Sequence, residues 1–214
     1  MERMDEFFTE RVEGYDEHML TNVEGCKEGY LEMSKYVPKN CSSLLDLGCG
    51  TGLELDEILK RMPNISITGI DLTQAMLDKL KEKHPDKPMH LICGSYFDVP
   101  FEASSYECVL SFQTMHHFSH ERKLFLYEKV YRALTPDGIY LECDYMVENQ
   151  EVEDFYYSEN SRIRKELGIP ADEFYHYDTP CTISNQIALL RDAGFRHVEK
   201  VFRIENTTLL VARR

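Results

Sequence analysis

The sequence predicts an α/β fold built on a mostly parallel, doubly wound sheet. Short apolar runs alternate with amphipathic segments along most of the 214 residues, which is the pattern of strands joined by crossover helices. The first apolar run ends in a glycine cluster at residues 48–52, which is typical of a tight turn from a strand into a helix. The last two apolar runs are separated only by residues 204–206, so we expect them to pair as an antiparallel hairpin.

Each strand and helix follows from the spacing of its apolar residues. Strands are expected at residues 44–47, 65–70, 89–93, 108–112, 139–145, 198–203 and 207–212. Helices are expected where apolar residues recur at helical spacing, around Leu55, Ile58, Leu59 and Met62, then Met76, Leu77 and Leu80, then Leu124, Tyr127, Val130, Tyr131 and Leu134, and finally Ile187, Leu190 and Ala193. Thr73 is expected to cap the second of these helices, and residues 135–138 are expected to form a turn before the fifth strand.

Two segments depart from this alternation, and we expect both to be helical additions to one domain that spans residues 1–214. Residues 1–36 form an amphipathic, lid-like segment, which Gly14 and Gly25 are expected to divide into two or three short helices. Residues 146–180 are acidic and aromatic, and we expect an inserted helical cap there.

Composition excludes several classes of protein. The chain carries 24 basic and 38 acidic residues, a formal net charge of −14, and such a surface disfavours nucleic acid and anionic lipid as partners. The chain has no long uncharged apolar run, and its N-terminus begins with acids, so we expect no membrane span, no signal peptide and a cytoplasmic location. The seven cysteines lack CxxC spacing, which argues against a zinc site or a disulfide framework.

The glycine cluster carries the strongest functional signal. Residues 46–52 read Asp-Leu-Gly-Cys-Gly-Thr-Gly, and glycine at positions 48 and 50 lets the backbone turn tightly and approach a ligand closely. Asp71 ends the next strand, where an acid can accept hydrogen bonds from both hydroxyls of a ribose. Taken alone, Asp71 fits a helix-capping role equally well.

Two later loops also follow strands, at the edge where open α/β sheets bind ligands. Residues 93–101, after the third strand, combine polar groups with aromatic rings that can flank a flat purine. Residues 111–118, after the fourth strand, bring polar side chains and the pair His116 and His117 to the same edge.

Together these residues resemble the class I S-adenosylmethionine (SAM)-dependent methyltransferase family, from about residue 7 to the C-terminus. Residues 46–52 resemble its first motif, residues 69–71 its second, and residues 134–139 the turn before its fifth strand. The resemblance implies a Rossmann-like fold with helices on both faces of a seven-stranded sheet, in the order 3-2-1-4-5-7-6 with strand 7 antiparallel. It implies SAM as the cofactor, held by Tyr15, Asp46, Gly48, Cys49, Gly50, Asp71, Leu72, Met76, Ser95, Tyr96, Phe97, Ser111, Phe112 and Gln113.

Other nucleotide-binding classes fit the glycine cluster less well. A dinucleotide fold needs GxGxxG, whereas the third glycine here comes one residue early, and no Lys-Ser/Thr pair follows as in a P-loop. Among SAM enzymes, residues 189–195 and 209–212 also resemble the C-terminus of the carboxy-SAM synthases, which serve tRNA wobble-uridine modification. That activity needs an Arg in the pocket, and the sequence identifies none there. A non-catalytic SAM-binding protein is the third alternative.

Methyl transfer from a sulfonium is a direct displacement, so catalysis depends chiefly on positioning the acceptor. A base is needed only where the acceptor must lose a proton, and His116 and His117 are the candidate catalytic residues for that step, with packing or helix capping as their alternative roles. We assign no metal, although His116, Glu142, Asp144 and His176 are of suitable types and could converge near the sheet edge.

The acceptor is expected to be a small molecule, neutral or cationic, methylated on oxygen, nitrogen or carbon. Aromatic residues of the cap are expected to wall its pocket, and Tyr15 is expected to close over the methionine end of the cofactor, with core packing as its alternative role. We expect a monomer or a homodimer.

Overall fold

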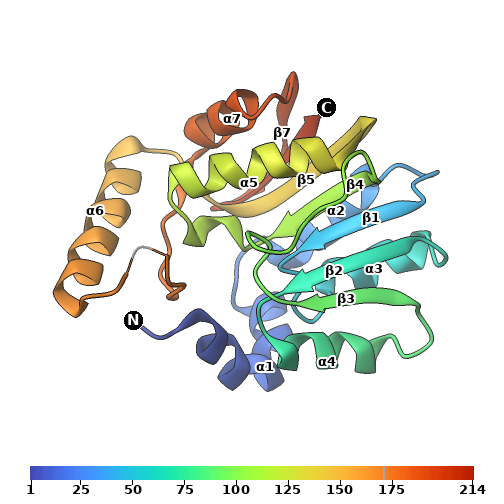
Figure 1. The fold of residues 1–214 in the computed structure, drawn as a ribbon, viewed down its shortest axis with the longest axis horizontal. Helices are drawn as coiled ribbons and strands as arrows, with labels where there is room; N and C mark the ends of the chain where they lie inside the picture. The colour runs from blue at the N-terminus through green and yellow to red at the C-terminus, as the bar shows by residue number, and fades with distance from the viewer. Residues whose placement is uncertain (171) are drawn as a thin grey trace.

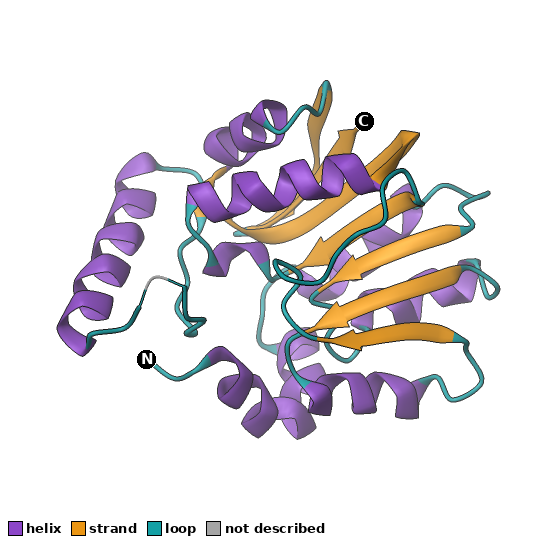
Figure 2. Cartoon of the chain, viewed as in Figure 1, coloured by secondary structure: helices purple, strands orange, loops and turns teal. Residues whose placement is uncertain are grey.

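The computed structural model of the protein describes residues 1–170 and 172–214. Its strands are β1 (Ser43–Leu47), β2 (Ser66–Asp71), β3 (Met89–Cys93), β4 (Tyr106–Phe112), β5 (Leu134–Val147), β6 (Cys181–Thr182), β7 (His197–Ile204) and β8 (Thr207–Arg213). Its helices are α1 (Met4–Thr21), α2 (Cys26–Tyr36), α3 (Leu53–Arg61), α4 (Gln74–Lys83), α5 (His120–Ala133), α6 (Gln150–Leu167) and α7 (Ile183–Asp192), with a 3-10 turn, η1 (Met115–His117). Figure 2 shows how helices and strands are distributed along the chain.

The strands form one twisted sheet in the order β3-β2-β1-β4-β5-β8-β7. The pairs from β3 to β5 are parallel, whereas β8 runs antiparallel to both β5 and β7. This confirms the predicted order and the predicted terminal hairpin, with β7 and β8 as the sixth and seventh strands. The short β6, which pairs with the end of β5, was not predicted.

Helices cover both faces of the sheet (Figure 1). Because side chains alternate along a strand, Leu44 of β1 packs on the face covered by α2 and α3, whereas Leu45 and Leu47 pack on the face covered by α5 and α7. The central strands are therefore buried on both faces, which explains why their sequences are nearly continuous apolar runs.

The N-terminal segment differs from the prediction at Gly14. α1 runs unbroken through this glycine, because a helix tolerates an exposed glycine at a cost of only about 1 kcal/mol, and nothing packs within 4 Å of where its Cβ would lie. Gly25 does interrupt the segment: its φ of +80° lies in the left-handed region, and α2 begins immediately after it.

The predicted cap contains one long helix. α6 begins after Asn149, whose side chain accepts hydrogen bonds from two amides of the first turn, and ends at Gly168 with a φ of +64°. Residues 174–180 form an extended segment that leads to β6, and the amide of His176 in it donates to the carbonyl of Glu2, just before α1. Residue 171, within the predicted cap, lies outside the described residues.

Two predicted local features are wrong. Residues 135–138 do not separate a helix from a strand; they form an irregularity within β5, where Leu134 pairs with Tyr106 and Ile139 with Cys108. Thr73 occupies the position before α4, but its side chain makes no capping bond. The carboxylate of Asp71 instead accepts the Thr73 amide, at 2.8 Å.

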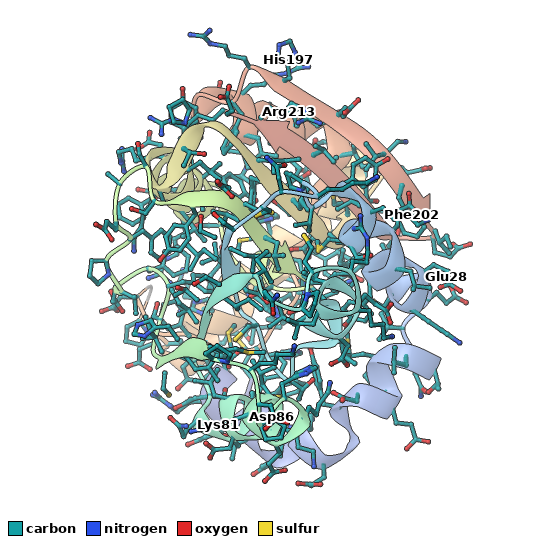
Figure 3. The ribbon with its side chains drawn as sticks, turned by 90° about the vertical axis from the view of Figure 1, so that its right-hand side faces the viewer. Glu28, Lys81, Asp86, His197, Phe202 and Arg213 are labelled. Carbon is teal, nitrogen blue, oxygen red and sulfur yellow. The ribbon has the colours of Figure 1, made fainter. Side chains whose placement is uncertain are left out.

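The two ends of the sheet differ in character. Figure 3 views the molecule from the side at which the parallel strands begin, and the side chains labelled there include the exposed Glu28, Lys81, Asp86 and His197. The strands run from this side towards α1 and α6 (Figure 1), so their carboxyl ends meet at the opposite edge.

Within residues 1–170 and 172–214, no helix has both the length and the apolar character to cross a bilayer.

Candidate functional site

The carboxyl ends of the parallel strands border a cavity of about 610 Å³, partly open to solvent. α1 and the extended segment after α6 contribute to its wall from the side opposite the sheet. Its lining residues are Met4, Phe8, Tyr15, Gly48, Gly50, Asp71, Leu72, Met76, Gly94, Ser95, Tyr96, Phe97, Phe112, Gln113, Thr114, His117, Phe118 and Phe174. Most of the predicted cofactor-binding residues are therefore brought together on one wall.

The turn after β1 has the geometry that its glycines allow. Gly48 has a φ of +74°, and its amide donates to the carbonyl of Ile70 at 2.8 Å, which fixes the turn against β2. A Cβ at Gly48 would lie 2.8 Å from the hydroxyl of Thr114, so no larger residue fits there. Gly50, with a φ of +47°, faces the cavity, and the nearest atom to its missing Cβ is 3.9 Å away in Tyr15. A ligand can thus approach the backbone at Gly50.

Asp71 lies on the cavity wall and ties the glycine turn to α4. One carboxylate oxygen accepts the Gly50 amide at 2.8 Å, and the other accepts the Thr73 amide at 2.8 Å. Burial raises the pKa of Asp71 to about 6, although both amide bonds favour the charged form. Each oxygen keeps a second acceptor position, so the carboxylate can also accept hydrogen bonds from ligand hydroxyls.

Aromatic and apolar side chains form another part of the wall. The hydroxyl of Tyr96 lies 2.9 Å from that of Thr114, which joins the loop after β3 to the loop after β4. The ring of Phe97 stacks on Phe174 with centroids 5.8 Å apart, and Phe118 meets Phe97 edge-on at 4.8 Å. These rings border a space suited to a flat, largely apolar group such as a purine.

α1 supplies the cover of the cavity. Phe8 and Tyr15 line it, with their ring centroids 6.2 Å apart, and burial raises the pKa of Tyr15 above its usual range. The next residue, Asp16, bonds the Thr51 hydroxyl of the glycine turn and lies 3.1 Å from the ammonium of Lys83 on α4. These contacts fix the helix against the turn that it covers.

His116 and His117 lie side by side on η1, with ring centroids 4.0 Å apart, but they face different surroundings. Nδ1 of His116 lies 2.5 Å from a carboxylate oxygen of Asp144, and although burial opposes it, this carboxylate raises the pKa of His116. Burial, with the charge of His116, holds the pKa of His117 well below its usual range. Of the two, His117 lines the cavity.

A second, wider hollow adjoins the cavity. This outer groove encloses about 1950 Å³, much of it open to solvent, between α1, η1 and the β7–β8 turn. It shares four lining residues with the cavity, namely Phe8, Tyr15, Gln113 and His117. The outer groove, but not the cavity, is also lined by His116, Tyr145, His176 and Asp178.

Three predicted cofactor contacts lie behind the cavity wall. Cys49 packs beside Gly69, and the hydroxyl of Ser111 lies 2.7 Å from that of Tyr140. Asp46 is fully buried on the α3 side of the sheet. A cofactor-binding role for these three residues stays a prediction.

Asp46 has an acidic neighbour that sequence reasoning missed, Glu54 on α3. Burial raises the pKa of both carboxyl groups, that of Glu54 to about 7, and the charge of Glu54 adds to the increase for Asp46. Two buried acids in proximity favour retaining a proton, so this pair carries less than its full negative charge beneath the glycine turn.

The structure also brings in site residues that no motif indicated. Phe174 is one of the cap aromatics expected to wall the acceptor pocket, whereas Met4 and Phe8 on the cavity wall belong to a segment read only as a lid. Their apolar side chains at helical or irregular spacing do not differ from core positions. Thr114 could have been identified, because it lies between Gln113 and the histidine pair at the end of β4.

The metal ligands considered from sequence do not all converge. His116 meets Asp144, but Glu142, two residues earlier on the same face of β5, accepts a hydrogen bond from Gln186 and does not contact His116. Burial, with the charge of Asp144, raises the pKa of Glu142 to about 8. His176 lies near His117 instead, with ring centroids 5.0 Å apart.

The residues present fit an adenosyl sulfonium. The open backbone at Gly50 and the carboxylate of Asp71 offer polar contacts, while Tyr96 and Phe97 offer an aromatic wall. Among the described residues that line the cavity there is no Lys or Arg, so nothing cationic repels a positively charged sulfonium.

Comparison with known proteins gives the same class. A family model described as a methyltransferase domain matches residues 44–138. A carboxy-S-adenosyl-L-methionine synthase of Helicobacter pylori (strain G27) is 31% identical over 184 residues, which cover 80% of this chain and 75% of that protein. The corresponding synthase of Wolinella succinogenes is 29% identical over 229 residues, covering 97% of this chain and 92% of that protein.

Solved structures agree in fold. Human N-acetylserotonin methyltransferase in complex with SAM superposes with a TM-score of 0.69 at 16% identity, covering 98% of this chain. The chain spans 56% of the length of that protein. With the glycine turn, the strand order and the sequence identity in agreement, the chain belongs to the class I SAM-dependent methyltransferase family, an enzyme family whose cofactor is SAM.

Proposed function

We propose that the protein transfers the methyl group of SAM to a small-molecule acceptor bound in the outer groove. The observation that carries this proposal is that the cavity and the outer groove meet at Phe8, Tyr15, Gln113 and His117. A cofactor in the cavity and an acceptor in the outer groove would share that boundary, which is the arrangement that direct displacement requires.

In this proposal each part of the site has a physical task. The cofactor supplies an electrophilic methyl group on a good leaving group. The glycine turn and Asp71 bind and orient it, and Phe8 and Tyr15 exclude water from the boundary. His117 accepts the acceptor proton, because its lowered pKa keeps the ring neutral and its lone pair available at physiological pH. His116, held by Asp144, stays beside it as the second candidate base.

The charge of the outer groove favours a neutral or cationic acceptor. Four acids line it, Glu10, Glu24, Asp178 and Glu205, against the single guanidinium of Arg11 among the described lining residues. An anionic acceptor would pay a repulsion here that a phenol, an amine or a thiol would not.

A carboxy-SAM synthase is the second candidate, and the curated relatives at about 30% identity favour it. A carboxylated cofactor carries an extra negative charge that must be paired when buried. The described residues that line the cavity include no Lys or Arg to pair with it. On this ground we favour methyl transfer, with a non-catalytic SAM-binding role as the remaining alternative.

Mass spectrometry of the nucleoside that co-purifies with the protein tests these alternatives. SAM or its demethylated product supports the proposal, whereas a species heavier than SAM by the mass of carbon dioxide would establish the synthase. A panel of phenols, amines and thiols, assayed for release of the demethylated cofactor, then identifies the acceptor class. SAM binding with no turnover across the panel would favour the non-catalytic role.

A further inference from the structure

Three electron-rich side chains meet on the wall of the outer groove. Nε2 of His116 and Nδ1 of His117 each lie 3.5 Å from the same carboxylate oxygen of Asp178. The ligand atoms of these three residues all lie within 4.8 Å of one another. Both imidazoles are buried, with 9% and 3% of their side-chain surface exposed, so water cannot readily satisfy them.

The orientation of His116 is fixed by Asp144. Nδ1 of His116 donates to this carboxylate at 2.5 Å, so Nε2 of a neutral ring carries its lone pair towards Asp178. Asp144 is itself held by the amides of Met115 and Tyr145, at 2.6 and 2.7 Å. A carboxylate that orients a histidine in this way is the usual support of a metal-binding imidazole.

His117 adds an unsatisfied atom. Its Nδ1 has no hydrogen-bond partner among the described residues, and the 3.5 Å to Asp178 exceeds the range of about 2.7–3.2 Å for N–H···O bonds. A proton on His116 could bridge that ring to Asp178, but it would leave His117 unpaired. A single cation between the three atoms would satisfy all of them.

We propose that His116, His117 and Asp178 bind one divalent transition-metal ion of the zinc type. Two nitrogen or oxygen ligands at about 2.0–2.2 Å from a tetrahedral ion are themselves about 3.3–3.6 Å apart, which matches both separations to Asp178. Two imidazoles and one carboxylate leave the fourth position open to the outer groove, where Tyr145 and His176 lie.

A second cluster of possible ligands is less suitable. His120, Glu153 and Cys181 also lie within reach of one ion. However, the ammonium of Lys123 lies 3.0 Å from the sulfur of Cys181, and the ring of His120 already lies 2.7 Å from Glu153. The positive charge of Lys123 therefore disfavours a metal ion in this second cluster. Among the described ion pairs, by contrast, no Lys or Arg is within salt-bridge distance of Asp178.

The proposed ion would face the acceptor. An acceptor oxygen or sulfur in the open position would lose its proton to solvent more readily, because a bound cation stabilises the anion. With the ion bound both imidazoles are ligands, so the proton-accepting role proposed for His117 belongs to the metal-free protein. This step rests on the proposed function, but binding of the ion does not.

Metal binding is tested on the full chain without SAM or acceptor. Chelator-treated protein is titrated with Zn²⁺ by calorimetry and with Co²⁺ by visible absorption, in a Cys93→Ser background because Cys93 is the exposed thiol of the described residues. We expect one ion per chain and a tetrahedral cobalt spectrum without a thiolate band. Asp178→Asn should weaken binding about 100-fold, and Asp144→Asn about 10- to 100-fold.

Matched variants make the outcome decisive. Asp137→Asn, an exposed acid in the β5 irregularity, should bind as tightly as the parent. Equal affinity of Asp178→Asn and the parent would overturn the proposal, as would binding that Cys181→Ser abolishes and Asp178→Asn retains. Asp178 is 38% exposed, so its variant should fold, which thermal melting verifies. Metal binding in a protein that transfers no methyl group would instead count against the proposed function alone.

Discussion

The clearest perturbation of the proposed cofactor site is the replacement of Asp71. Its carboxylate accepts the amides of Gly50 and Thr73, each at 2.8 Å, and faces the cavity between them. Charge-assisted hydrogen bonds of this kind contribute about 1.5–3 kcal/mol each. Asp71→Ala should therefore both loosen the glycine turn and remove the proposed contacts to the ribose hydroxyls.

We expect Asp71→Ala to weaken SAM binding by about 1–3 kcal/mol, the scale of charged hydrogen bonds to buried hydroxyls, which corresponds to about a 5- to 150-fold rise in Kd. Asp71→Asn should have a smaller effect, because its amide oxygen still accepts one of the two backbone amides. Calorimetric titration with SAM measures both. Asp78→Asn, an exposed acid on α4, is the matched control and should leave the affinity unchanged.

The pH dependence supplies a second arm. Burial raises the pKa of Asp71 to about 6, and a ligand that donates hydrogen bonds to the carboxylate favours its charged form. SAM affinity should therefore be full above that value and fall as the pH drops through 6, with protons released on binding in that window. Asp71→Asn should lack this dependence. Unchanged affinity in Asp71→Ala, or an identical pH profile in Asp71→Asn, would refute the placement of the ribose.

Four other substitutions address the glycine turn, α1, the core and the proposed base. Gly50→Ala should lower SAM affinity severalfold by projecting a methyl group into the cavity at positive φ, whereas Gly14→Ala should leave SAM binding intact and stabilise α1 by up to about 1 kcal/mol in thermal melts. The pKa of Glu142 is raised from its ordinary value of 4.5 to about 8. Between these two pH values the folded state keeps a proton that the unfolded state releases, so the free energy of unfolding should fall as the pH rises from 4.5 to 8. In urea titrations, Glu142→Gln should remove up to about 5 kcal/mol of that fall in stability. Curves of stability against pH that are parallel for variant and parent would contradict the raised pKa. His117→Ala should reduce kcat far more than it raises the Kd for SAM, and a turnover that matches the parent from about pH 6 to 9 would rule out a proton-accepting role.

The central strands and the glycine turn could be predicted from local sequence patterns. β1 and β4 are short apolar runs bounded by glycine or polar residues, and burial on both faces leaves such runs little freedom to form anything else. The glycine turn was predictable for the same reason, because positive φ at Gly48 and Gly50 excludes most other residues. Once the strand order is right, the loops at the carboxyl ends converge by topology.

Features set by tertiary contacts escaped prediction. Gly14 was expected to end a helix, but α1 gains enough from packing along its length to continue through it. Residues 135–138 contain the Pro-Asp-Gly signal of a turn, yet β5 extends across them because its flanks pair with β4 on both sides of the irregularity. Local propensity is a weak guide wherever a neighbouring strand or helix supplies more bonds than the turn itself.

The histidine cluster at the boundary between the cavity and the outer groove is completed by tertiary contacts that the spacing of residues in the sequence does not reveal. The Met4 amide donates to the Phe174 carbonyl, and the Thr179 amide to the His116 carbonyl, so one extended segment joins the start of α1 to η1. That segment carries Asp178, which is why an acid far along the chain lies beside the two histidines. The strand ends could therefore be anticipated, whereas the acid that completes the histidine cluster could not. Because the same segment borders both the cavity and the outer groove, a change in its position would alter the proposed cofactor and acceptor sites together.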